Sequence, residues 1–196
     1  MFQYLPYLVF VGAAVHVLGS LAYLRDTLRG TTKPNRVTFL LWAIAPLIGV
    51  AAAITAGVGW AILPVFMAGF GPLVIFFASF VNPNAYWKLE KFDYTCGLFS
   101  VLALVLWAIT QQPLVAIILA IVSDGFATFP TLIKSWRYPE TETAIAYATS
   151  LFSALTGFAA IQTGAISEYI FGIYLVVANL LLVLAVYRRK IFSHDI

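Results

Sequence analysis

The stretch LRGTTKPNRVTFLLW, residues 28–42, returns in outline as IKSWRYPETETAIAY, residues 133–147. Each copy has a basic residue, a proline five positions later, a threonine four positions after that, and then an aromatic residue. The matched positions all lie 105 residues apart: Arg29 and Lys134, Pro34 and Pro139, Thr38 and Thr143, Trp42 and Tyr147. A constant offset of this kind predicts an internal repeat.

Composition indicates the class of protein. Of the 196 residues, 62% are hydrophobic and 10% are charged, and the mean hydropathy is +0.96. A soluble domain has roughly 45–50% apolar and about 25% charged residues, so an integral membrane protein is predicted. A spanning helix needs about 20 mostly apolar residues. The apolar runs predict seven such helices, at about residues 5–25, 36–57, 60–82, 93–111, 113–134, 141–163 and 166–188.

The charged residues predict the orientation. All 11 Lys and Arg residues follow the first, third, fifth or seventh span, so they fall on one side of the membrane. The positive-inside rule then places the N-terminus outside and the C-terminus in the cytoplasm, and it requires an odd number of spans. The same rule explains the net charge of +3 without a nucleic-acid partner. We expect a multi-pass protein of the cytoplasmic (plasma) membrane, the inner membrane where a cell has two, and a homo-oligomer is compatible with the sequence.

The repeat predicts an all-α architecture. Two copies of three spans can run in the same direction only if an odd number of helices joins them, and the fourth span supplies that helix. The prediction is a 3 + 1 + 3 arrangement of two parallel triple-helix bundles, related by an axis along the membrane normal. The bundles cover residues 1–92 and 113–196, and the linker helix covers residues 93–112.

The second copy carries a family resemblance. In FPTLIKSWRYPETE, residues 129–142, an aromatic residue and Pro-Thr precede a basic residue and a polar turn that opens the next helix. This resembles the proline-centred signature of the SWEET and PQ-loop (MtN3-like) transporters, with the PnuC-type vitamin transporters as a sister family of similar plan. The resemblance implies a carrier for a small solute. Arg25 stands where Pro130 falls in the second copy, and the third span has no mid-span asparagine. The resemblance therefore does not identify the solute as a sugar.

Asp124 is the most informative single residue, because it lies near the middle of the fifth span. A charged side chain at that depth costs roughly 2.5–3.5 kcal/mol on insertion scales, so Asp124 should face a cavity or a partner, or be neutral. Thr128 and Thr131 follow on the same helical face. This face predicts a path for a solute or a proton. The alternative is a protonated Asp124 that only bonds a neighbouring helix.

Four other residues are candidate solute ligands. His16 lies at mid-depth in the first span, where it could pair with Asp124 across the bundle axis or simply pack. Trp42 and Tyr147 are equivalent in the two copies, so their rings are expected to approach a central cavity from opposite sides. Asn179 lies within the seventh span, where its amide requires partners. Helix packing is the alternative for all four.

Three prolines are candidate hinge or gate positions. Pro34 and Pro139 suit the first turn of the second and sixth spans, where a missing N–H is harmless. Pro130 interrupts the fifth span and frees a backbone carbonyl one turn back, which predicts a kink or a hinge at the inner end. One cysteine and two distant histidines give no expectation of a disulfide or a metal site, and no cofactor is expected.

The pattern as a whole favours a transporter of a small neutral or weakly charged solute, sugar-like or vitamin-like. Transport would proceed by alternating access, either facilitative or coupled to protons through Asp124. A non-transporting seven-helix receptor or a membrane scaffold is the alternative. A retinal receptor is disfavoured because every lysine lies at a cytoplasmic end of a span. No motif of an intramembrane enzyme is present, so the chain is not expected to be an enzyme.

Overall fold

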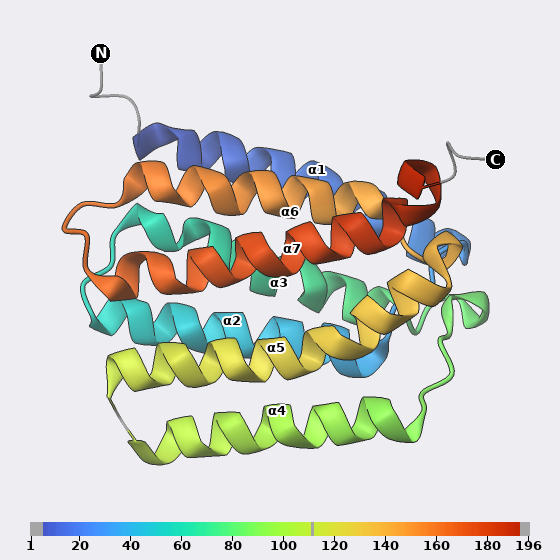
Figure 1. The fold of residues 1–196 in the computed structure, drawn as a ribbon, viewed down its shortest axis with the longest axis horizontal. Helices are drawn as coiled ribbons and strands as arrows, with labels where there is room; N and C mark the ends of the chain where they lie inside the picture. The colour runs from blue at the N-terminus through green and yellow to red at the C-terminus, as the bar shows by residue number, and fades with distance from the viewer. Residues whose placement is uncertain (1–5, 111, 193–196) are drawn as a thin grey trace.

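The structure is a computed structural model that describes residues 6–110 and 112–192. The described residues form seven α-helices that lie side by side with their long axes nearly parallel (Figure 1). Short 3-10 helices flank several of them. The α-helices are α1 (Leu8–Arg29), α2 (Arg36–Thr55), α3 (Leu63–Ala78), α4 (Lys91–Thr110), α5 (Pro113–Arg137), α6 (Ala144–Gly157) and α7 (Ile166–Phe192).

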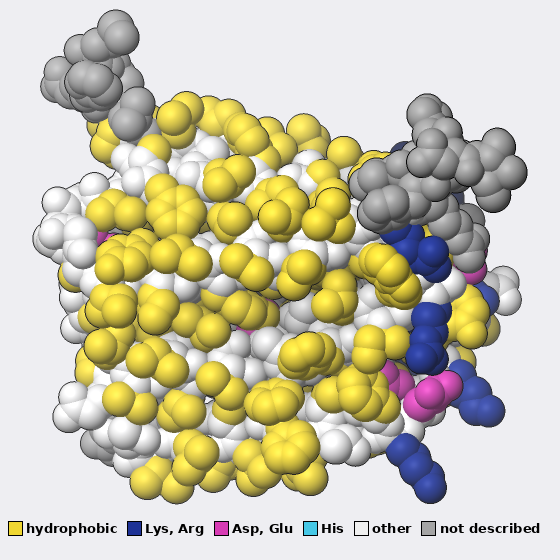
Figure 2. All heavy atoms as spheres, viewed as in Figure 1, with side chains coloured by type: hydrophobic (Ala, Val, Ile, Leu, Met, Phe, Trp, Pro, Cys, Tyr) yellow, Lys and Arg dark blue, Asp and Glu magenta, His cyan; other side chains and the backbone are white. Residues whose placement is uncertain are grey.

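Six of the described helices are long and apolar enough to cross a membrane. The exception is α6, which has 14 residues and continues in a 3-10 helix to give the shorter apolar segment Ala144–Ala160. Large apolar side chains cover the face shown in Figure 2, as expected for a surface that meets lipid chains rather than water. The chain is an all-helical, multi-pass integral membrane protein, as the composition predicted.

The connections with basic residues lie at the same end of the bundle. The α1–α2, α3–α4 and α5–α6 connections meet there, and the Lys and Arg side chains of the visible face gather at that end in Figure 2. We call it the basic end. The side chains of Arg189 and Lys190, included in the charge prediction, lie outside the described part.

Six helices form a closed ring of neighbours. Around the ring, α1 packs against α3, α3 against α2, α2 against α5, α5 against α7, α7 against α6, and α6 against α1. Helix α4 lies outside the ring and packs mainly on α5, with a smaller contact to α2 (Figure 1). Ser100 of α4 donates a hydrogen bond of 2.7 Å to the backbone oxygen of Ser123, which ties α4 to α5 near the middle of both helices.

Close packing of α1 on α6 depends on two glycines. A Cβ atom built on Gly19 would lie 1.8 Å from Thr149 Oγ1 and 3.2 Å from the Cα atom of Ala146. One built on Gly12 would lie 2.0 Å from Thr156 Oγ1. Small residues of this kind let two helix backbones approach closely in a membrane, where lipid gives no hydrophobic drive for association.

The predicted placement of Pro34 and Pro139 inside the first helical turn is wrong. Helix α2 begins at Arg36, because the side chain of Asn35 accepts hydrogen bonds from the backbone N–H groups of Val37 and Thr38 and so caps the helix. Pro34 therefore precedes the cap. Pro139 opens a separate 3-10 helix, Pro139–Thr141, before α6 begins at Ala144.

Pro130 lies inside α5, as predicted. A proline at this position has no N–H for the carbonyl four residues earlier, which weakens the helix locally. Thr38 of α2 donates a hydrogen bond of 2.8 Å to the backbone oxygen of Ala127 in the same turn. The carbonyl that Pro130 leaves without its helical partner is that of Phe126, next to Ala127, and α5 bends in its second half (Figure 1).

Candidate functional site

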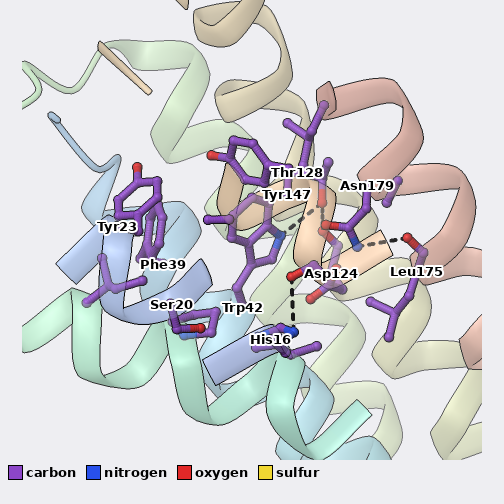
Figure 3. Close-up of a pocket in the computed structure, with 17 residues that line it drawn as sticks. His16, Ser20, Tyr23, Phe39, Trp42, Asp124, Thr128, Tyr147, Leu175 and Asn179 are labelled. Carbon is purple, nitrogen blue, oxygen red and sulfur yellow. Dashed lines mark hydrogen bonds between the residues drawn. The ribbon is translucent and has the colours of Figure 1, made fainter. Parts of the chain in front are cut away.

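A cavity opens inside the ring of six helices, and all five residues predicted as ligands line it. Its empty space, with the open solvent at its mouth included, is about 580 Å³. Helices α1, α2, α3, α5, α6 and α7 contribute lining residues, whereas α4 contributes none of the described ones. The structure therefore brings together the five predicted residues from five different helices (Figure 3): His16, Trp42, Asp124, Tyr147 and Asn179.

Asp124 faces the cavity and is 3% exposed. The hydroxyl of Tyr174 on α7 donates a hydrogen bond of 2.6 Å to Asp124 Oδ2. One turn further along α5, Thr128 donates to the backbone oxygen of Asp124 at 2.8 Å and accepts a bond of 2.9 Å from Trp42 Nε1. Thr131, predicted on the same polar face, is buried but does not line the cavity.

His16 lies on α1 and does not pair with Asp124. Its Nδ1 atom is 3.2 Å from the hydroxyl of Ser150 on α6, which is the hydrogen bond that the ring makes. The side chain is 4% exposed and lines the cavity. His16 thus has the predicted depth, and its partner belongs to α6 instead of α5.

The rings of Trp42 and Tyr147 touch each other in one wall of the cavity, instead of approaching it from opposite sides as the repeat predicted. Their centroids are 6.3 Å apart and their planes are inclined by 77°, an edge-to-face contact. Phe39 contacts Trp42 at 5.3 Å, and Tyr23 contacts both Phe39 at 5.1 Å and Tyr147 at 6.3 Å. Four aromatic rings from α1, α2 and α6 therefore form a continuous wall, which we call the aromatic wall.

Asn179 lines the cavity from α7. Its Nδ2 atom donates a hydrogen bond of 2.8 Å to the backbone oxygen of Leu175, one turn earlier on the same helix. The predicted alternative, a bond to another helix, is not the one that this amide nitrogen makes. This hydrogen bond orients the Asn179 side chain without a partner on another helix.

A buried ion pair near the basic end was not predicted as part of the site. Lys134 Nζ lies 2.6 Å from Glu142 Oε1, and the two side chains are 2% and 0% exposed. Glu142 Oε2 accepts hydrogen bonds from the hydroxyls of Tyr23, at 2.8 Å, and Tyr147, at 2.6 Å. The carboxylate of Glu142 therefore holds two members of the aromatic wall.

The Lys134–Glu142 pair also lies where the α1–α2 and α5–α6 connections meet. Lys134 Nζ also donates to the backbone oxygen of Lys33, and the backbone N–H of Lys33 donates to the backbone oxygen of Thr141 at 3.1 Å. The hydroxyls of Thr32 and Thr143 are 2.7 Å apart. The signal for this cluster was present in the sequence, since a lysine at the end of one span and a carboxylate at the start of the next can meet across their short connection.

Within the described residues no group of three or more His, Cys, Asp and Glu side chains is arranged to hold a metal ion. Comparison of the chain with protein-family models, with curated proteins and with solved structures found no match.

Proposed function

We propose that the chain is a membrane transporter for a small neutral or weakly charged solute, sugar-like or vitamin-like, and that the solute binds in the cavity inside the ring. The observation that carries this proposal is that six helices share one cavity, to which the outer helix α4 contributes no described side chain. Carriers of this size bind their solute near the middle of the bilayer, between helical repeats.

The helix contacts support a 3 + 1 + 3 arrangement. In this proposal α1–α3 and α5–α7 are the two bundles, α4 is the linker, and α6 is a seventh span. Equivalent contacts occur in pairs: α1 with α6 corresponds to α5 with α2, and α1 with α3 corresponds to α5 with α7. Such reciprocity is expected for two copies related by a two-fold axis along the membrane normal. The N-terminus is proposed to lie outside and the C-terminus in the cytoplasm.

Alternating access would then be rocking of one bundle against the other. Opening towards the basic end requires separation of the two connections that Lys134, Glu142 and the Thr32–Thr143 pair hold together. Pro130 is the proposed hinge because it weakens α5 between the cavity and this end. Pro34 and Pro139 lie in the moving connections themselves, where a fixed φ limits the shapes that the chain can adopt.

The resemblance to SWEET and PQ-loop transporters, and to the PnuC type, stands as part of this proposal. It rests on the stretch at residues 129–142 and on the helical plan. Facilitated diffusion is the simpler mechanism. Coupling to protons through Asp124 is the variant, and it predicts uptake that increases with an acid-outside gradient and is lost in Asp124→Asn.

The test is a ligand screen followed by flux. Purified protein is screened by thermal shift against sugars, vitamins and amino acids, and any ligand found is measured in a counterflow assay with proteoliposomes. We expect saturable flux that is lost in Trp42→Ala and in Asn179→Ala. Leu102→Ala, on the exposed face of α4, is the control that should retain flux.

Two other outcomes of these measurements would each contradict a part of the proposal. A ligand that is indifferent to both cavity variants does not bind at this site. A ligand that binds here without any flux favours the seven-helix receptor or scaffold instead of the transporter.

A further inference from the structure

The cavity has an unbalanced charge. Of the 17 residues that line it, Asp124 is the one acid, and none is a lysine or an arginine. Asp124 takes part in neither of the ion pairs Arg25–Asp26 and Lys134–Glu142. Burial of a carboxylate without a cationic partner is costly, so a site of this kind favours a ligand that supplies the missing charge.

Among the side chains that the structure describes, no basic one is placed to supply the missing positive charge. Lys134 lies ten residues further along α5, about 15 Å away at 1.5 Å per residue. Its ammonium is bound to Glu142 and to the carbonyl of Lys33. His16 lines the cavity, but its Nδ1 atom bonds Ser150. Asp124 Oδ2 accepts one bond, from Tyr174, and a carboxylate has acceptor capacity for more than one donor.

The rest of the lining suits an organic cation. The aromatic wall of Tyr23, Phe39, Trp42 and Tyr147 lines the same cavity. Trp42 Nε1 donates to the hydroxyl of Thr128, which donates to the backbone oxygen of Asp124, and the indole and the carboxylate line the same cavity. Aromatic rings attract cations through their quadrupoles, tryptophan most strongly, and aromatic pockets of this kind recognise quaternary ammonium groups.

We propose that the solute is a small organic cation whose ammonium group binds beside Asp124 and against the aromatic wall, and that this group and a proton compete for the Asp124 carboxylate. The inference rests on the proposed transport function and replaces its neutral or weakly charged solute with a cation. An anionic solute would meet an uncompensated carboxylate and is disfavoured. Competition for one acid makes the exchange of one proton for one cation across the membrane the expected mode of coupling. For such a cation an acid-outside gradient should drive export, the opposite of the uptake expected for a neutral solute carried together with a proton.

The other titratable groups that face Asp124 are few. Helix α7 presents Tyr174, α1 presents His16 and Tyr23, and α6 presents Tyr147. Helices α2 and α3 bring no titratable side chain to the cavity lining. The acidic and basic side chains of α4 are Lys91 and Asp93, in its first turn and away from the cavity, where Asp93 accepts a hydrogen bond from Asn35. Asp124 is therefore the carboxylate to which a competition between proton and cation is assigned.

The test compares choline with its uncharged isostere 3,3-dimethyl-1-butanol by titration calorimetry on the purified full chain. At neutral pH we expect choline to bind about tenfold tighter or better, the size of a desolvated cation–aromatic and charge contribution. Choline binding should weaken as the pH falls, whereas binding of the isostere should not change. Asp124→Asn should reduce the affinity for choline to that for the isostere.

Substitutions of Trp42 test whether choline binding needs an aromatic ring or only an apolar side chain of similar size. Trp42→Leu should lose affinity for choline and Trp42→Phe should retain part of it, because the phenyl ring keeps a quadrupole. Leu102→Ala should bind as the wild type does. Asp124→Glu, which keeps the carboxylate, should retain the preference for choline. If Asp124→Asn cannot be purified, the pH dependence of choline binding to the wild type tests whether a proton and choline compete for the Asp124 carboxylate.

Equal binding of choline and its isostere, or choline binding that survives in Asp124→Asn, overturns the inference. Failure of the cation inference can be distinguished from failure of the proposed transport function. Counterflow of an uncharged solute that choline does not inhibit keeps the transporter and removes the cation site, whereas choline binding without flux keeps the cation site and removes the transporter.

Discussion

At the scale of single residues, Glu142 connects the cavity with the basic end of the bundle. Its carboxylate accepts hydrogen bonds from Tyr23 and Tyr147, which line the cavity, and pairs with Lys134, which binds the opposite connection. A change in the aromatic wall is therefore transmitted directly to the contacts that close this end. Because both charged side chains are almost fully buried, each depends on the other for compensation.

We expect Glu142→Gln to destabilise the protein strongly. Loss of one partner leaves the Lys134 ammonium buried without its counter-charge, which costs about 3–5 kcal/mol in buried pairs. Lys134→Met should have a similar effect, because it leaves the Glu142 carboxylate buried without its counter-charge. The double variant should be destabilised by less than the sum of the two, because it leaves no unpaired charge. Thermal unfolding in detergent measures all three.

The control for this cycle is Glu90→Gln, an exposed glutamate in the α3–α4 connection. A change at an exposed site is expected to stay within about 0.5 kcal/mol of the wild type. Additive effects of the two buried substitutions would mean that Lys134 and Glu142 do not compensate each other in the membrane protein.

At the scale of helices, the contact of α1 with α6 is the one most sensitive to side-chain size. Gly19→Ala would place a methyl group within van der Waals overlap of Thr149 and close to the backbone of Ala146. We expect a loss of about 1–3 kcal/mol, as for other overpacked sites. Gly125→Ala in α5 is the matched control, because its nearest atom, Tyr174 Cε2, would be 3.9 Å away. Equal unfolding temperatures of the two variants would contradict the close approach.

Helix orientation is tested by labelling single cysteines. In a Cys96→Ala background, Thr163→Cys in the α6–α7 connection should react with a membrane-impermeant maleimide applied to intact cells. Lys88→Cys in the α3–α4 connection should react only after the membrane is permeabilised, because the positive-inside rule places the basic end in the cytoplasm. The reverse pattern would invert the proposed orientation, and labelling of both from outside would exclude an odd number of spans between residues 88 and 163.

At the scale of the whole molecule, transport requires the two bundles to separate at the basic end. The hydroxyls of Thr32 and Thr143 are 2.7 Å apart, so cysteines at these positions can reach disulfide geometry. In the Cys96→Ala background we expect the double variant to crosslink on oxidation, to stop counterflow and to recover it on reduction. Ligand binding should persist in the crosslinked form. Each single cysteine variant is the control.

Undiminished flux through the fully crosslinked protein would show that this end does not open during transport. The crosslinked fraction is measured by the shift of the denatured chain on a non-reducing gel, so that flux and closure are compared in the same preparation.

The depth of each candidate residue could be predicted from the sequence, because spans of about 20 apolar residues place every position along the membrane normal. Span boundaries assign His16, Asp124 and Asn179 to mid-span positions, and the repeat assigns Trp42 and Tyr147 to equivalent positions; the structure places all five at one cavity. The all-helical membrane fold followed from composition for the same reason. The depth of a residue follows from its distance along a helix, and the fold class follows from the apolar fraction of the chain.

Partners across helices were decided by the tertiary structure alone. Rotation of a helix about its axis and its choice of neighbours depend on packing, which hydropathy does not encode. His16 bonds Ser150 instead of Asp124, the rings of Trp42 and Tyr147 touch, and Lys134 is a buried partner of Glu142 instead of a surface charge. The local start of α2 at the Asn35 cap, which leaves Pro34 outside the helix, likewise required the folded backbone.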